Sequence, residues 1–184
     1  MIAGIIIGVL AMIIVIWFIA TYNGLIRVKN IVNNAWSQSD VQLKRRYDLI
    51  PNLVETVKDY MEYEQETLTA VTKARNMAMN AGGVKEQAQA ENMLTGALKS
   101  LFAVVENYPD LKANENVMQL QEELTSTENK ISYARQFYND SVMRFNTMTE
   151  VFPTNIIAGM FNFTKREFFE IPEEEREAPK VNLR

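Results

Sequence analysis

The chain opens with an uninterrupted apolar stretch, and no later segment resembles it. Residues 2–20, IAGIIIGVLAMIIVIWFIA, contain no charged side chain. At a rise of ~1.5 Å per residue, this stretch is about 28 Å long as a helix, which matches the hydrocarbon core of a bilayer. No Lys or Arg precedes it and FIATYNG offers no small-residue cleavage site, so the pattern does not indicate a removable signal peptide. We predict a transmembrane anchor at residues 1–21.

The residues after this stretch predict its orientation. Arg27 and Lys29 follow it closely, so the positive-inside rule places the N-terminus outside and the rest of the chain in the cytoplasm. Trp17 and Tyr22 lie near the inner boundary, where aromatic side chains with a polar tip favour the headgroup layer. We expect these two residues to anchor the helix at the membrane interface.

Small residues share one face of the predicted span. They are Gly4, Gly8 and Ala11. A GxxxG pattern of this kind lets two membrane helices approach closely, and it therefore predicts pairing of the span. The alternative is that these residues have no such role, because small residues are common in membrane helices.

Residues 22–152 are predicted to form a bundle of long amphipathic helices. Apolar positions recur at steps of three and four, the spacing that places one stripe on a helix face. The few glycines and prolines divide the region into helices over about 22–50, 51–80, 85–107 and 114–152. The pattern predicts an all-α fold in which the transmembrane helix is followed by an antiparallel bundle of long helices.

Individual positions make this prediction testable. The first stripe comprises Leu25, Val28, Val32, Ala35, Ser39 and Leu43. The stripe of the second helix includes Tyr60 and Glu64, and that of the last helix ends at Phe152. Asn114 is of a residue type that caps helix N-termini, so we expect it to start the last helix.

The number of helices in the bundle depends on Pro51. Proline removes one backbone hydrogen bond and disfavours helix at the preceding residue, so we expect a turn or a sharp kink there, giving three or four helices. Lys44, Arg45 and Arg46 come shortly before it. Cations in that position complement the negative end of a helix dipole, and the same three side chains are a candidate docking rim for a partner protein.

The composition changes after the last long helix. Residues 153–169 are crowded with apolar side chains, among them the candidate interaction residues Ile156, Ile157, Met160, Phe161 and Phe163. One interpretation is a short helix that folds back and caps the bundle. The other is an exposed apolar patch that contacts lipid or a partner. Residues 170–184 are rich in Glu and Pro and predict a flexible acidic tail.

The amino-acid composition limits the kinds of catalytic and binding site that the chain can form. The chain has no cysteine and no histidine, so it lacks thiolate nucleophiles and the commonest general base and transition-metal ligand. We predict no catalytic, cofactor-binding or metal-ligating residues. The net charge is −4, from 19 basic and 23 acidic side chains, and no basic patch stands out, so we predict no binding to nucleic acid.

Three long stretches of the chain carry a family resemblance. They are YNGLIRVKNIVNNAWSQSDVQLKRRYDLIPNLVETVKDY at residues 22–60, PDLKANENVMQLQEELTSTENKISYARQFYNDSVMRFN at 109–146, and FPTNIIAGMFNF at 152–163. In this order they resemble the LemA family of bacterial membrane proteins. The resemblance implies a single span in the bacterial cell membrane, a short N-terminus outside and a cytoplasmic antiparallel helical bundle. It implies no known catalytic activity and supplies no catalytic residues.

Two functional hypotheses follow. The preferred one is a non-catalytic, membrane-anchored helical scaffold that self-assembles into a homo-oligomer or contacts other membrane proteins, since confinement to a membrane raises effective concentration. The alternative is a regulatory adaptor that tethers an enzyme or sensor kinase to the membrane through the rim at residues 44–46. We disfavour an enzyme, because no phosphate loop, nucleophile motif or acid–base pair with a partner is recognisable.

Overall fold

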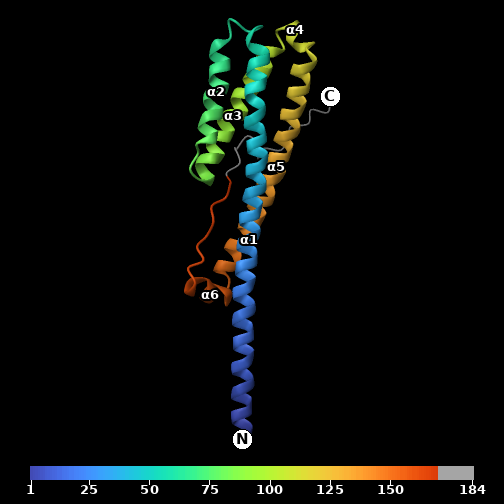
Figure 1. Ribbon diagram of the computed structural model, residues 1–184. Helices are drawn as coiled ribbons and strands as arrows, with labels where there is room; N and C mark the ends of the chain where they lie inside the picture. The colour runs from blue at the N-terminus through green and yellow to red at the C-terminus, as the bar shows by residue number, and fades with distance from the viewer. Residues whose placement is uncertain (170–184) are drawn as a thin grey trace, which may run out of the picture. The chain divides into compact units, whose positions relative to one another are not determined.

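The computed structural model describes residues 1–169, whose contacts divide them into two compact units. We call Met1–Gln38 with Gln136–Phe168 the anchor unit, and Ser39–Arg135 with Phe169 the bundle unit. The helices, drawn in Figure 1, are α1 (Ile2–Lys58), α2 (Gln65–Met79), α3 (Val84–Val105), α4 (Pro109–Lys112), α5 (Glu115–Glu150) and α6 (Thr154–Met160). The described residues contain no strand, so the predicted all-α class is confirmed. The predicted acidic tail lies outside the described residues.

The bundle unit consists of four long helical stretches and the short helix α4, packed around one core. The long stretches are residues 39–58 of α1, α2, α3 and residues 115–135 of α5, and neighbours among them run in opposite directions (Figure 1). Each stretch contributes one apolar stripe to the shared core. Its fully covered members include Leu53, Val57, Val71, Leu94, Leu101, Leu111 and Ile131. Burial of each such side chain stabilises the fold by roughly 1.5–3 kcal/mol.

Of the two alternatives expected at Pro51, the turn does not form, because α1 continues through this residue to Lys58. A proline at position 51 leaves the carbonyl of Tyr47, four residues earlier, without its helical hydrogen bond. Arg75 on α2 supplies the missing donor, since its Nε lies 2.7 Å from the Tyr47 carbonyl oxygen. The apolar stripe also continues on both sides of Pro51, with Ile50 and Leu53 buried. Packing and a substitute hydrogen bond therefore keep the helix intact.

The chain turns instead at residues 59–64, inside the helix predicted over 51–80. Short-range backbone hydrogen bonds close this turn, from Tyr60 N to Val57 O (3.1 Å) and from Glu64 N to Met61 O (3.1 Å). The buried Met61 side chain ties the turn to the core. Several carboxylates in the turn lie at the negative C-terminal end of α1 and the positive N-terminal end of α2, where they favour a new helix over continuation of the old one.

Other sequence-based boundaries agree with the structure. The predicted helix at 85–107 is α3, and α5 begins directly after Asn114. The Asn114 Oδ1 accepts hydrogen bonds from the backbone N–H groups of Asn116 (2.9 Å) and Val117 (3.3 Å), so the predicted N-cap is confirmed. All six members of the stripe at residues 25–43 are buried. Tyr60 and Phe152 are exposed, because each lies just beyond the end of a helix.

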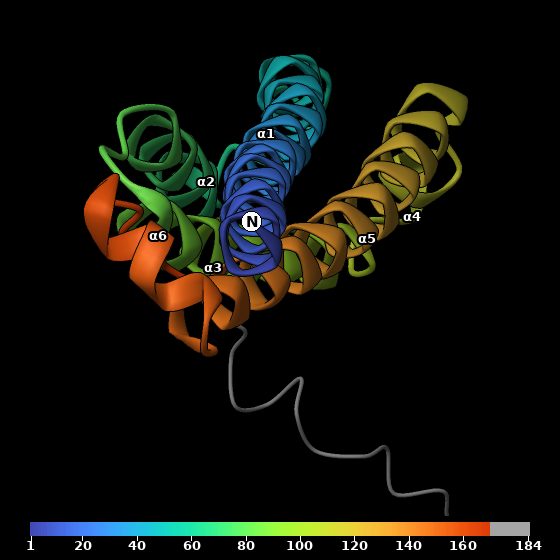
Figure 2. The same cartoon turned by 90° about the horizontal axis from the view of Figure 1, so that it is seen from below.

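The anchor unit joins α1 to the segment that follows α5. Leu25 of α1 forms a buried cluster with Ile157 and Ala158 of α6. Figure 2, which looks along α1 from its N-terminal end, shows α6 as a short separate helix after α5. Beyond α6, residues 161–168 are held by side chains of α5. The Asn146 amide bonds both backbone groups of Arg166 (2.8 and 2.9 Å), and the Tyr138 hydroxyl donates to the Glu167 carbonyl (3.0 Å).

Candidate membrane and protein interaction site

The N-terminal part of α1 is exposed on every face. Within the anchor unit, the side chains of residues 2–20 are all exposed except Phe18, which is half-buried. Among the residues that the structure describes, α1 is the one helix long and apolar enough to cross a membrane. An apolar helix surface that the protein leaves uncovered is what a membrane-spanning helix presents to lipid. The structure thus supports the predicted anchor.

The small-residue face of this segment is open. A Cβ added at Gly4 or Gly8 would meet no atom within 4 Å, and Ala11 is exposed. No other part of the described chain fills the shallow surface that these three residues leave on α1. A second helix could therefore approach this face closely.

Aromatic side chains gather where α1 leaves its apolar stretch. The ring of Phe161 lies 4.7 Å from that of Tyr22 and 6.0 Å from that of Phe18, measured between centroids. Phe163 packs against Tyr22 at 6.1 Å and against Phe145 of α5 at 6.3 Å. We call these five residues the aromatic cluster. Tilted and edge-to-face pairs at such distances add stability beyond area burial, about 0.5–1.5 kcal/mol each. Among the two predicted interface residues, Tyr22 thus belongs to this cluster, and Trp17 remains 37% exposed on α1.

The apolar residues after α5 divide between two environments. Ile157 is buried, and Phe161 and Phe163 belong to the aromatic cluster. Ile156 and Met160 are 52% and 63% exposed. One face of α6 therefore packs on α1 and the opposite face is open.

A polar pocket of about 180 Å³ adjoins the aromatic cluster. The Lys29 Nζ lies 5.8 Å from the centroid of the Phe163 ring, a cation–π geometry. Asn162 has a φ of 53°, a left-handed conformation that turns the chain at this point. The pocket is lined by Tyr22, Ile26, Lys29, Phe145, Phe161, Asn162, Phe163, Thr164 and Arg166. Two of its side chains are cationic and none is a carboxylate.

The three cations before Pro51 do not form one exposed rim. Lys44 pairs with Asp48 (3.0 Å) one turn along α1, and Arg45 pairs with Glu123 of α5 (2.6 Å). Arg46 is 2% exposed and lies inside the bundle unit. Because α1 continues to Lys58, these cations are also far from its C-terminus, and the predicted dipole role is wrong.

Arg46 is the centre of a buried polar network that the sequence analysis missed. Its guanidinium contacts Glu91 (3.2 Å) and Glu128 (2.8 Å) and donates to the Thr95 hydroxyl (2.8 Å). Glu91 is fully buried on α3. A signal was available, because Glu91 interrupts the apolar stripe that includes Ala88 and Leu94, three residues to either side.

Glu91 also lies 3.9 Å from Arg135 Nη2, and two further side chains donate hydrogen bonds to it. The Tyr47 hydroxyl donates a hydrogen bond to the Glu91 carboxylate, and Gln87 Nε2 donates to the same oxygen (3.1 Å) and to the Tyr47 hydroxyl (2.8 Å). Burial, together with the negative charge of Glu91, raises the pKa of Tyr47 far above its ordinary value of 10.0. Tyr47 is thus held protonated, as a donor to Glu91. The network links α1, α3 and α5 by partnered charges, an arrangement suited to specifying how the helices pair.

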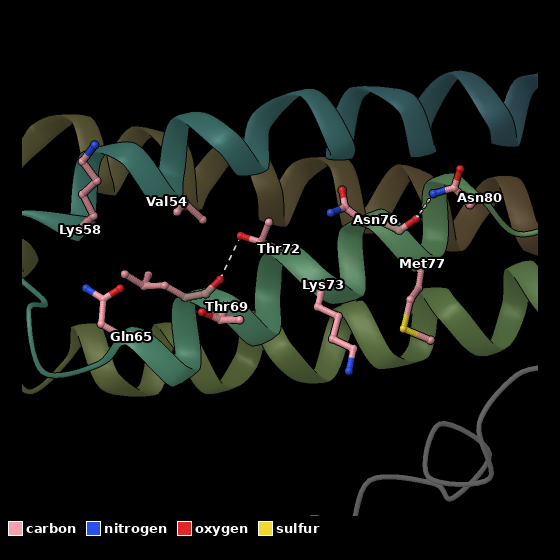
Figure 3. Close-up of a pocket in the computed structure, with 10 residues that line it drawn as sticks. Val54, Lys58, Gln65, Thr69, Thr72, Lys73, Asn76, Met77 and Asn80 are labelled. Carbon is pink, nitrogen blue, oxygen red and sulfur yellow. Dashed lines mark hydrogen bonds between the residues drawn. The ribbon is translucent and has the colours of Figure 1, made fainter.

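An open groove of about 780 Å³ runs between α1 and α2 in the bundle unit (Figure 3). Its polar side chains are largely engaged by their own helices. Thr72 donates to the Leu68 carbonyl (3.0 Å), and Asn80 Nδ2 donates to the Asn76 carbonyl (2.7 Å). The hydrogen bond from Lys58 to Glu55 and the charge of that carboxylate raise the pKa of Lys58. The ionisable groups that line the groove are Lys58 and Lys73, which offer no acid–base pair.

Within residues 1–169, no group of three or more Asp or Glu side chains is placed to hold a metal ion. Glu91 is the one buried carboxylate in this part of the chain, and it is already bonded to Arg46, Tyr47 and Gln87. The surface of the described residues therefore offers three features suited to contacts with other molecules. They are the apolar N-terminal part of α1, the open face of α6 and the cationic pocket.

Comparison with known proteins identifies the family. The sequence profile of the LemA family matches residues 35–183. The chain belongs to the LemA family. The resemblance seen in its three long stretches is thereby confirmed.

Relatives of this LemA-family chain are bacterial. The protein LemA of Metamycoplasma hominis is 29% identical over 164 residues, which cover 86% of this chain and 73% of the relative. The magnetosome proteins MamQ 2 and MamQ 1 of Paramagnetospirillum magneticum are each 23% identical over 192 residues, covering 88% of this chain and 71% of each relative. None of these names denotes an enzyme. The family and the apolar helix together describe a membrane-associated helical protein.

Proposed function

We propose that this protein is a non-catalytic helical scaffold, anchored in the bacterial membrane by α1, that acts by self-association and by contacts with other membrane proteins. The observation that carries the proposal is the open face of Gly4, Gly8 and Ala11 on a helix segment that the rest of the described chain leaves uncovered. Two copies in one membrane meet at high effective concentration, and small residues let their backbones approach closely.

The proposal extends to topology. Arg27 and Lys29 follow the apolar stretch, and both side chains lie outside the span on α1. Lys and Arg next to a span favour its cytoplasmic side. We therefore place the bundle unit in the cytoplasm and the N-terminus outside.

The first test is the size of the full-length protein after gentle extraction from membranes, measured by electron microscopy and mass determination. A scaffold forms an assembly larger than a monomer. Gly4→Ile combined with Gly8→Ile places branched side chains on the small-residue face and should shift the particle toward the monomer, while helix content stays unchanged. A control variant, Ala3→Ile with Ala20→Ile, places the same branched side chains on other faces and should leave the particle size as it was. A monomeric wild-type particle would reject self-association.

A second variant examines α6 as a contact surface. Phe161→Glu is unsuitable, because Phe161 packs on Tyr22 and its loss would disturb the anchor unit itself. Ile156→Ser with Met160→Ser changes exposed side chains instead. If α6 joins subunits, this variant should also yield smaller particles. Particles of unchanged size would exclude that role for α6.

A further inference from the structure

We infer that α6 and the loop after it form, with α1, an interfacial binding site for an anionic phospholipid, in which Lys29 and Arg166 hold the headgroup phosphate. This inference requires that α1 enters the bilayer, and it does not depend on self-association. All of its residues belong to the anchor unit.

The first step is the depth of α6. Phe18 lies in the apolar stretch, two residues before its end at residue 20. Since some 20 apolar residues span a hydrocarbon core of about 30 Å, Phe18 lies just inside the core boundary. The ring of Phe161 is 6.0 Å from that of Phe18. The C-terminal end of α6 therefore lies at the boundary between acyl chains and headgroups.

The second step is the open face of α6. Ile156 and Met160 are one turn apart on the helix and exposed, and Phe161 is 45% exposed. At this depth the surrounding medium is lipid, so the open face continues the apolar surface of the span. This continuity identifies acyl chains as the occupant, in the manner of a helix lying in the membrane interface.

The third step is the pocket. Side chains on a helix tilt toward its N-terminus, so Lys29 on α1 points back toward the membrane. Its ammonium lies over Phe163, whose ring packs against Tyr22, two residues beyond the apolar stretch. The pocket is thus at the level of the headgroups, where a cation meets lipid phosphates.

The fourth step is the chemistry of the lining. Lys29 and Arg166 bring positive charge, Asn162 and Thr164 bring hydrogen-bond donors, and no carboxylate lines the pocket. The buried Asn146 fixes the backbone of Arg166, because its amide nitrogen donates to the Arg166 carbonyl and its amide oxygen accepts from the Arg166 N–H. A volume of about 180 Å³, several times the ~30 Å³ of a water molecule, accommodates a phosphodiester. Arginine and lysine are the side chains that bind phosphate best.

The binding test uses full-length protein in monodisperse neutral-detergent micelles. It is titrated with dioctanoyl phosphatidylglycerol, dioctanoyl phosphatidylcholine and inorganic phosphate. Lys29→Gln with Arg166→Gln removes the two pocket cations. Arg27→Gln with Arg144→Gln is the matched control, because it removes the same charge from exposed positions of α1 and α5 that do not line the pocket.

We expect phosphatidylglycerol to bind in preference to phosphatidylcholine, and its affinity to fall at least about tenfold in the pocket variant but not in the control. An equal loss of affinity in both variants would mean that binding depends only on the overall charge of the protein, and it would overturn the proposed site. Equal binding of the two lipids would do the same. Saturation by inorganic phosphate at similar affinity would assign the pocket to free phosphate and overturn the lipid.

A second experiment measures the depth of α6 in the membrane and does not depend on whether the charge variants are stable. A spin label at Met160→Cys, in protein reconstituted into phosphatidylglycerol nanodiscs, should be more accessible to oxygen than to a water-soluble nickel complex. A label at Met143→Cys on α5, which is exposed in the same unit, should show the reverse. Aqueous accessibility at both positions would overturn the interfacial placement of α6, whatever the oligomeric state of the protein.

Discussion

At the scale of single residues, the bundle unit contains charged side chains that are buried and paired with one another. Glu91 has no exposed surface, and it receives the guanidinium of Arg46 and the hydroxyl of Tyr47. A buried ion pair adds little net stability to a fold compared with apolar side chains of similar volume. Removal of one partner, however, leaves an uncompensated buried charge that strongly destabilises the fold. The network therefore makes one arrangement of α1, α3 and α5 strongly preferred over alternatives.

Glu91→Ala should destabilise the protein by about 3–5 kcal/mol, because it leaves Arg46 buried with only part of its counter-charge. The measurement is chemical unfolding of full-length protein in neutral detergent, followed by circular dichroism. Glu122→Ala is the control, since Glu122 is exposed on α5, and it should cost less than about 0.5 kcal/mol. Equal effects of the two substitutions would show that the Glu91 network does not stabilise the bundle.

Tyr47 should make stability fall at high pH. Burial raises the pKa of Tyr47 in the folded protein, whereas the unfolded chain loses this proton near pH 10. Its contribution is fully present below about pH 10 and declines above it, by ~1.4 kcal/mol per pH unit. Tyr47→Phe should flatten that decline, although it weakens the fold at neutral pH through the lost hydrogen bond to Glu91. Tyr133→Phe, at an exposed position, should leave the pH profile unchanged when melting is followed from pH 7 to 11.

At the scale of elements, α1 shows how a proline is accommodated inside a helix. The carbonyl of Tyr47, which a non-proline residue at position 51 would satisfy, accepts a hydrogen bond from Arg75 of α2 instead. The same contact fastens α2 against α1. The carbonyl that Pro51 leaves without a helical hydrogen bond thus contributes to the packing of α2 against α1.

This arrangement predicts a measurable coupling between Pro51 and Arg75. Arg75→Met should destabilise the protein by about 1.5–3 kcal/mol, because a buried carbonyl loses its charged donor. With Pro51→Ala, residue 51 regains an N–H for the Tyr47 carbonyl, and the same substitution at Arg75 should cost about 1 kcal/mol less. A double-mutant cycle on thermal or chemical unfolding gives this difference. Identical costs in the two backgrounds would mean that Arg75 does not replace the missing bond.

At the scale of the whole molecule, the protein combines a long apolar N-terminal helix, which we propose spans the membrane, with a helical bundle. Its orientation is open to a direct test, since the chain has no cysteine. With the N-terminus outside, Ile2→Cys should react with a membrane-impermeant maleimide on intact cells. Tyr63→Cys, at a 92% exposed position, should react only after the cell membrane is made permeable. The opposite labelling pattern would invert the proposed topology and place the bundle outside the cell.

Much of the architecture follows from periodicity and composition. The apolar stretch at residues 2–20, the buried stripe from Leu25 to Leu43, the cap at Asn114 and the end of α5 before Pro153 are all readable in the chain. Each depends on residues within a few turns of one another, because a helix of 3.6 residues per turn brings positions three and four apart onto one face. The division of residues 153–169 into a packed and an open face was not predictable, since the apolar pattern there does not separate the buried from the exposed side chains.

Periodicity, composition and the three long stretches are enough to indicate an all-α protein of the LemA family with a long apolar helix, because those properties are local and recur along the chain. Three features depend on tertiary contacts: the continuation of α1 through Pro51, the burial of Arg46, and the division of α6 into a packed and an open face. The Tyr47 carbonyl finds its donor 28 residues away, and Arg46 finds Glu91 at a separation of 45 residues. A carbonyl without its helical hydrogen bond, or a buried charge, destabilises the fold unless another group pairs with it. These partners lie far away in the sequence, so local sequence patterns do not reveal them.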